Sequence, residues 1–306
     1  MEASIVIPVY NAGLYLRQSL DSVFKAADHL IEIICVDDFS EDNSVEILQE
    51  YQIIFPNLKI FKNKYNIGVT RTLIKAISNS TYDLIIRHDA DDLMSPNRIS
   101  SIRSHLSETK NTFFFGCCLT QIFADSHKIF STLAPPLSLE EFRLAMCNFT
   151  SPCAHGSIFF SRSLYIRVGG YNPKYSVAQD FALYISFLEC KNIAYVPIYS
   201  DQPLYFHRIS SSSVTARSWR RKIFLKYQMF GLYKKAKISP NPHKDYLLFF
   251  FKSFVNLILY SVFSEKNLII YRSRISALSR FPSPYTRVLC RIYYYISFTL
   301  KSIFHK

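Results

Sequence analysis

Residues 84–99 have the sequence LIIRHDADDLMSPNRI, in which a short apolar run leads directly into a cluster of ionisable side chains. Leu84–Ile86 is predicted to be a buried strand. Apolar residues then recur at helical spacing over 99–106, and Ser95-Pro96 is expected to open that helix. A strand followed by a helix is the repeating unit of a parallel α/β sheet.

The same alternation fills the first half of the chain. Three further strands are predicted, at Ala3–Pro8, Ile31–Val36 and Leu58–Phe61. A helical pattern of apolar residues follows each of them, over 16–27, 45–51 and 69–77. This order predicts an α/β fold with a mainly parallel central sheet that is covered by helices on both faces.

The second half of the chain is less regular. Residues 121–153 are expected to be loop-like, with Pro135-Pro136 as a break. A strand over 157–160 and a helix over about 179–189 are predicted after that segment.

The charge is distributed unevenly along the 306 residues. Residues 217–306 contain 18 Lys and Arg and two Asp and Glu, which gives a net charge of +16. Residues 1–216 contain 18 Lys and Arg and 21 Asp and Glu, which gives −3. We therefore expect a catalytic domain over 1–216 and a basic, aromatic-rich helical extension over 217–306. The seven cysteines have no metal-binding spacing, and the first residues, MEASIVIPVYN, are not a signal peptide, so a reducing cytoplasmic setting is expected.

Acidic residues follow two of the predicted strands. Asp37 and Asp38 come after the second strand, and Asp89, Asp91 and Asp92 come after the fourth. In a parallel α/β sheet ligands bind beyond the carboxyl ends of the strands. Crowded carboxylates repel one another unless a cation lies among them, and Mg²⁺ or Mn²⁺ would suit these oxygen ligands. The alternative is a pair of solvated acidic turns.

Five segments, in order and spacing, resemble family 2 glycosyltransferases, which are inverting nucleotide-sugar transferases of the GT-A fold. The segments are SIVIPVYN, VDDFSEDNS, NIGVTRTLIKA, RHDADDLMSPNRI and GGYNPKYSVAQDFALYISF, and together they span roughly residues 3–210. The resemblance implies an enzyme that transfers a sugar in bacterial surface-polysaccharide synthesis.

The resemblance implies a nucleotide site at the end of the first two strands. Pro8, Val9 and Tyr10 would line the base. Asp38 would accept a hydrogen bond from the uracil imide, and Asp37 would support that turn.

The resemblance also implies the catalytic groups. Arg71 would lie near the nucleotide or its diphosphate. Asp89 and Asp91 would be the metal motif, with Asp91 as the more direct ligand, and Asp92 would face the donor sugar or ribose. Asp180 matches the carboxylate that deprotonates the acceptor hydroxyl.

The sequence departs from the family pattern beside this base. The family usually has Glu-Asp where this chain has Gln179-Asp180, so a flanking charge is lost on the acceptor side. His207 and Arg208 resemble a late histidine/arginine motif, and His155 stands where the family often has histidine. For both histidines a structural role and a contact with substrate remain open.

The tail is expected to bind the anionic inner face of the cytoplasmic membrane peripherally, through basic and aromatic residues over 219–233 and 285–306. Residues 246–263 are apolar but contain Lys252, so an interfacial helix is favoured over a spanning one. A solvated basic helical cap is the alternative. Nucleic-acid binding is not expected, because no such motif is present.

The sequence thus predicts a transferase that moves a hexose or N-acetylhexosamine from a UDP-sugar to a saccharide acceptor, expected to be polyprenyl-diphosphate-linked, with Mn²⁺ or Mg²⁺ as cofactor. Two alternatives stay open, a nucleotidyltransferase on the same fold and an inactive relative that acts as a membrane scaffold. The first would not need Asp180.

Overall fold

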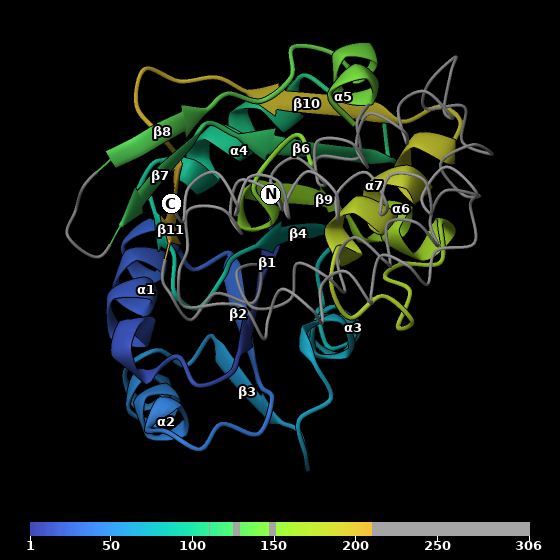
Figure 1. Cartoon of the computed structure of the whole chain (residues 1–306). Helices are drawn as coiled ribbons and strands as arrows, with labels where there is room; N and C mark the ends of the chain where they lie inside the picture. Colours follow the sequence, from blue (N-terminus) through green and yellow to red (C-terminus); the bar gives the residue numbers. More distant parts are fainter. Residues whose placement is uncertain (110, 125–128, 147–150, 210–306) are drawn as a thin grey trace, which may run out of the picture.

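The structure, a computed structural model, describes residues 1–109, 111–124, 129–146 and 151–209. Within these ranges the strands form two sheets (Figure 1). The larger sheet contains, in spatial order, β10 (Ala194–Ile198), β6 (Phe114–Cys118), β9 (Ile158–Ser161), β4 (Leu84–Arg87), β1 (Ala3–Val9), β2 (Ile31–Asp37) and β3 (Leu58–Lys62). The smaller sheet contains β5 (Leu93–Met94), β11 (Tyr205–Ile209), β7 (Thr120–Ala124) and β8 (Ile129–Leu133).

Helices cover both faces of the larger sheet. One hydrophobic core joins this sheet to α1 (Gly13–Ala26), α2 (Ser44–Ile54) and α4 (Arg98–Ser107). A second core joins the opposite face to α3 (Val69–Ser78), α5 (Leu139–Met146), α6 (Arg162–Arg167) and α7 (Gln179–Glu189). The two cores take alternate residues of β1 and β2, as the side-chain period of a strand requires. The sandwich predicted from strand–helix alternation is therefore confirmed.

The direction of the strands is also mainly as predicted. β1 lies between β2 and β4 and pairs with both in parallel, and β2 pairs with β3 in parallel. Only β9, among the strands that the structure describes in this sheet, runs antiparallel to its neighbours β4 and β6. The sheet is therefore mixed and mainly parallel, and the ends of β1, β2 and β4 meet at one edge.

The prediction of a loop over 121–153 is wrong. β7 and β8 form an antiparallel hairpin there, and α5 follows it. β8 exposes four of its five residues, so it lacks the alternation of buried and exposed positions that identifies a strand in sequence. α5 buries only Phe142 and Met146, which is too few for a clear helical period.

The start of α4 also differs from the prediction. The helix begins at Arg98, after a turn at Pro96-Asn97, and not at Ser95-Pro96. Ser95 opens the turn that leads into the helix, because its carbonyl accepts from the N–H of Arg98 (3.0 Å), while its own N–H donates to the carbonyl of Leu204 (3.1 Å).

The basic tail over 217–306, with its expected interfacial helix, lies outside the described residues. The boundary predicted at residue 216 lies outside them as well. Among the helices of the described ranges, none has the length and apolar character needed to cross a bilayer.

Candidate active site

The two acidic clusters lie at the same edge of the larger sheet, on either side of the end of β1. The N–H of Asp38 donates to the carbonyl of Val9 (2.8 Å), and the N–H of His88 donates to the carbonyl of Val6 (3.2 Å). These bonds continue the parallel pairing of β1 with β2 and β4. The topology therefore brings together acids that are about 50 positions apart in the sequence, as strand-end placement predicted.

Asp38 organises the loop before α3. Its carboxylate accepts hydrogen bonds from Asn63 Nδ2 (2.9 Å) and from the backbone N–H groups of Ile67 (2.9 Å) and Gly68 (2.8 Å). Gly68 has φ = +83°, a conformation that side-chain-bearing residues adopt only with strain. Asp38 is buried and holds this loop against β2, while its expected bond to a uracil imide stays a prediction.

The two carboxylate oxygens of Asp37 differ in their hydrogen bonding. Its Oδ2 accepts from the N–H of Ser40 (3.2 Å), which is the turn-supporting contact expected of this residue. Its Oδ1 is buried and has no hydrogen-bond partner among the described residues. The turn that follows is tight, since Phe39 has φ = +66°.

The remaining residues predicted to contact the nucleotide differ in exposure. Tyr10 is 51% exposed, so its ring is available for stacking, and Arg71 is exposed on the first turn of α3. Val9 is completely buried, so only its backbone could line a base. Pro8 is half-buried beside it.

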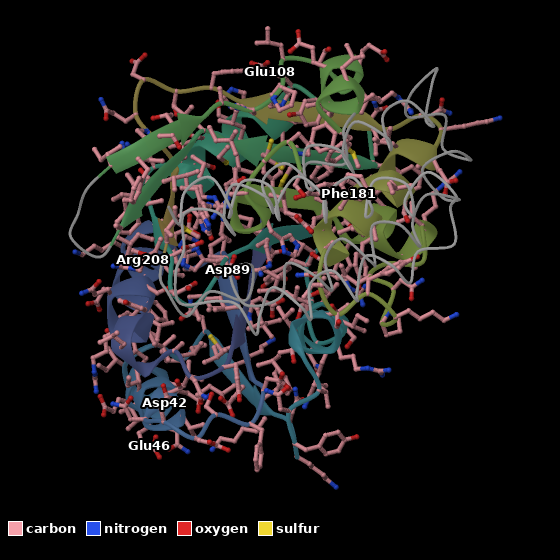
Figure 2. All side chains as sticks on the ribbon, viewed as in Figure 1. Asp42, Glu46, Asp89, Glu108, Phe181 and Arg208 are labelled. Atoms are coloured by element: carbon pink, nitrogen blue, oxygen red, sulfur yellow. The ribbon has the colours of Figure 1, made fainter. Side chains whose placement is uncertain are left out.

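Asp89 is half-buried and forms an ion pair with a buried arginine. Its Oδ1 lies 2.6 Å from Nη2 of Arg87, whose side chain is only 2% exposed. Burial alone would raise the pKa of Asp89, but the Arg87 guanidinium, together with His155 and His207, outweighs burial and lowers it. Asp89 is therefore an ionised carboxylate, and Figure 2 shows it near the centre of the molecule, away from Asp42 and Glu46 at the α2 end.

Asp91 has the opposite electrostatic character. Burial, and then the repulsion of the neighbouring Asp92 and Asp89 carboxylates, raise the pKa of Asp91 to about 7. The nearby His207 acts in the opposite direction but does not offset burial and repulsion. The turn that carries Asp89 and Asp91 is thus suited to a divalent cation.

Asp92 follows Asp91 in this turn, and its carboxylate forms hydrogen bonds with β11. Its carboxylate accepts from the Tyr205 hydroxyl, from Nδ1 of His207 (3.1 Å) and from the N–H of Arg208 (2.7 Å). The side chain is completely buried, so the structure gives Asp92 a supporting position. Its expected contact with the donor sugar stays a prediction.

His207 and Arg208 surround the acidic turn from β11. Burial opposes the charge on His207, but the Asp92 carboxylate raises the pKa of His207 to about 9. Arg208 donates through Nε to the carbonyl of Asp91 (2.9 Å), and its guanidinium lies over the rings of Tyr15 (4.4 Å) and Phe123 (4.7 Å). The late histidine/arginine pair therefore belongs to the site.

The expected base, Asp180, lies in the first turn of α7. Its Oδ2 accepts a hydrogen bond from Ser151 Oγ (2.7 Å). The residue before the helix, Ala178, has φ = +57°, which fixes an unusual entry into the turn that carries Asp180. Ser151 had no signal in the sequence, because it lies 29 residues from Asp180 in a segment without apolar periodicity.

His155 lies in the short turn that precedes β9. Burial and the nearby Arg87 lower the pKa of His155 to about 4, while the Asp180 and Asp89 carboxylates both act to raise it. Its Nε2 shares a hydrogen bond with the Tyr171 hydroxyl (2.6 Å). The imidazole ring of His155 is therefore neutral.

The donor set fits a cation that is shared with a phosphate. In the described ranges no group of three or more His, Cys, Asp and Glu could hold a metal ion. Mg²⁺ and similar hard cations are commonly held by one or two carboxylates, with substrate phosphate oxygens and water as the other ligands. Asp89 and Asp91 match that composition.

Comparison with known proteins identifies the family. The model described as glycosyl transferase family 2 matches residues 4–169, more than half of the chain. The chain belongs to glycosyltransferase family 2. It is therefore a glycosyltransferase, as its motifs implied.

Curated members of family 2 are similar over most of the chain. It is 24% identical over 249 residues to the putative glycosyltransferase EpsE of Bacillus subtilis, which covers 80% of this chain and 86% of the relative. It is 23% identical over 188 residues to an Escherichia coli UDP-Gal:alpha-D-GlcNAc-diphosphoundecaprenol beta-1,3-galactosyltransferase, with 60% of this chain and 67% of the relative covered.

Solved structures share the GT-A fold of family 2. S. aureus TarS 1–349 in complex with UDP-GlcNAc superposes with a TM-score of 0.65 and 17% identity, over 91% of this chain and 80% of that one. The mannosyltransferase PcManGT of Pyrobaculum calidifontis, in complex with GDP-Man and Mn²⁺, gives 0.56 and 15%, over 100% and 88%. At these identities the likeness shows the fold, which confirms the predicted fold class.

Proposed function

We propose that this family 2 enzyme transfers a hexose or N-acetylhexosamine from a UDP-sugar to a saccharide acceptor with inversion, and that Asp180 is the base. The observation that carries the proposal is that one short segment meets both carboxylates: Ser151 Oγ donates to Asp180 (2.7 Å), and a Cβ added to Gly156 would lie 3.0 Å from Asp89 Oδ2. A carboxylate base and an acidic, cation-binding turn, both next to this segment, are the two components that a single displacement requires.

The chemistry follows from these positions. Asp180 takes the proton of the acceptor hydroxyl, while the oxygen of that hydroxyl bonds to the anomeric carbon of the donor. The bond from that carbon to the phosphate oxygen breaks, and the nucleoside diphosphate leaves with the electron pair. A divalent ion at Asp89 and Asp91 would supply positive charge to the leaving diphosphate. One base and no enzyme nucleophile give inversion.

The residues around the acidic turn would hold it ready for the donor. Arg87 keeps Asp89 ionised, and Arg208 fixes the backbone carbonyl of Asp91. Tyr10 and Arg71 are exposed at the same edge of the sheet, where they would contact the base and the diphosphate. Mn²⁺ in the solved mannosyltransferase supports the choice of Mn²⁺ or Mg²⁺.

The finer substrate assignments rest on two similarities. TarS was solved with UDP-GlcNAc, which supports a UDP-sugar donor. The galactosyltransferase relative is named for a diphosphoundecaprenol-linked acceptor, which supports a lipid-linked saccharide acceptor for this chain. Because residues 217–306 carry a net charge of +16, which would attract anionic lipids, we propose that the enzyme lies peripherally at the inner face of the cytoplasmic membrane.

A donor panel tests the proposal. Purified full-length protein is incubated with Mn²⁺ and with UDP-glucose, UDP-galactose, UDP-GlcNAc, UDP-GalNAc or GDP-mannose, and nucleoside diphosphate release is measured with water as acceptor. We expect release from at least one UDP-sugar and its loss in excess EDTA. Release from GDP-mannose alone would contradict the donor assignment, and release that persists in EDTA would contradict the metal.

A further inference from the structure

Ser151 contacts the proposed base directly. Its hydroxyl donates to Asp180 Oδ2 at 2.7 Å, a short distance typical of a hydrogen bond to an ionised carboxylate. An aspartate at the start of a helix can rotate about both side-chain bonds, and a fixed donor selects one orientation of the carboxylate. This orientation matters for a base, because proton transfer needs close alignment with the acceptor hydroxyl.

The segment that carries Ser151 is anchored to the same helix as Asp180. Cys153 is buried, and its Sγ donates to the Tyr184 hydroxyl at 3.5 Å. Asp180 and Tyr184 are four residues apart on α7, so their side chains lie on one face a turn apart. Residues 151–153 therefore follow that face of α7 and meet it at two points.

The other end of this segment is fixed to the acidic turn. The Gly156 carbonyl accepts from Nη2 of Arg98 (2.9 Å), which also donates to the carbonyl of Arg87 (3.2 Å). A Cβ added to Gly156 would lie 1.6 Å from the Tyr205 hydroxyl and 3.0 Å from Asp89 Oδ2. The Tyr205 ring leaves room only for glycine at this position, and the chain there passes directly beside Asp89.

Residues 151–157 thus connect the base to the acidic turn through a short path with a contact at each end. The position of Asp180 relative to Asp89 is set by this segment as well as by α7. We propose that Ser151 is a positioning residue of the transferase, which orients the Asp180 carboxylate toward the acceptor. This inference rests on the proposed role of Asp180 as base.

Ser176 provides a matched control. It lies four residues before Asp180, and its Oγ is buried without a hydrogen-bond partner among the described residues. Replacing Ser176 by alanine removes the same atom from the same region without removing the contact to Asp180. Ser151→Thr keeps a hydroxyl at position 151 and tests rescue.

The experiment measures UDP release from the UDP-sugar that is turned over fastest in the donor panel, with full-length protein and Mn²⁺. We expect Ser151→Ala to lower kcat by about 10- to 100-fold, as misalignment of a reacting group does. The acidic limb of its rate–pH profile should move to higher pH, because a hydrogen bond that favours the ionised carboxylate is lost. Ser151→Thr should restore both quantities, and Ser176→Ala should change neither.

A second background separates positioning from general structural damage. If Ser151 acts through Asp180, Ser151→Ala should have no further effect on the residual rate of Asp180→Ala. An equal fold-loss in both backgrounds, or an unchanged rate and pH profile in the single variant, would overturn the proposal. If Asp180→Asn keeps the full rate, Asp180 is not the base, and the proposed function is wrong at that residue. Binding of UDP, measured by calorimetry, should be the same in all folded variants.

Discussion

The hydroxyl of Tyr205 donates a hydrogen bond to the buried carboxylate of Asp92, which precedes it by 113 residues. This contact ties β11 to the turn that carries Asp89 and Asp91. Asp92 also accepts from Nδ1 of His207 and from the backbone N–H of Arg208, so one carboxylate contacts three residues of β11.

Tyr205→Phe tests the strength of this contact. The variant leaves a buried carboxylate with one donor fewer, so the free energy of unfolding should fall by about 1–3 kcal/mol. Urea denaturation measures it. Tyr65→Phe, at a tyrosine that is 66% exposed, is the control and should change little. Equal stability of Tyr205→Phe and wild type would show that the bond to Asp92 contributes nothing.

Asp89 and Asp91 should respond oppositely to amide substitution in metal-free protein. Asp91→Asn removes a carboxylate whose pKa is raised to about 7, so it should stabilise the fold above pH 7, where that carboxylate is ionised, and less at pH 5. Asp89→Asn breaks the ion pair with Arg87 and should destabilise the fold.

Thermal unfolding in EDTA at pH 5 and pH 8 measures both effects. Both variants should lose UDP release in Mn²⁺. A full rate in Asp91→Asn would contradict its assignment as a metal ligand, whatever its stability.

Asp180→Asn tests the base. The amide keeps the shape of the side chain and can still accept from Ser151, but it cannot take a proton. We expect the transfer rate to fall by roughly 10²–10⁴, while donor affinity stays nearly constant. Steady-state kinetics and calorimetric titration with UDP separate the two. Weak donor binding together with a high residual rate would make Asp180 a structural residue.

The carboxyl group of Glu32 should make the stability of the fold depend on pH. Burial alone would raise the pKa of Glu32, but hydrogen bonds from Lys59, Ser4 and Thr81 outweigh it and lower the pKa. A group with a lowered folded pKa contributes stability above its unfolded pKa, about 4.3, and loses that contribution as the pH falls through the folded value. Glu32→Gln should therefore be less stable than wild type at pH 7.

The same difference should shrink as the pH falls below the unfolded pKa of the carboxyl group. Urea denaturation of both proteins between pH 7 and pH 3 provides the comparison. A difference that stays constant over this interval would mean that the charge of Glu32 does not contribute.

The tail is expected to bind anionic bilayers. Each Lys or Arg near such a surface contributes about 1 kcal/mol, so the +16 charge should dominate association at low salt. Protein cut near residue 216, and a full-length variant with Arg217, Arg220, Arg221 and Lys222 changed to Gln, should both bind vesicles more weakly. Sedimentation with anionic and neutral vesicles at low and high salt measures this. Full binding by the truncated protein would place the membrane contact in residues 1–216.

The sequence by itself determined the repeating part of the fold. β1, β2 and β4 are mainly apolar, buried segments, and α7 has an apolar helical pattern, because burial selects the residues that form each element. The acidic residues after β2 and β4 were also predictable, since strand ends at one sheet edge are brought together by parallel pairing.

The tertiary structure alone decided the partners of these groups. Ser151 and Asp180, or Asp92 and Tyr205, are joined by single polar contacts between segments far apart in the chain. Such contacts leave no period in the sequence, because they depend on the path of the intervening chain. The sequence predicts the strand that forms β9 but not its reversed direction, and it does not predict the exposed strand β8. Neither strand direction nor an exposed edge is encoded by hydrophobic alternation.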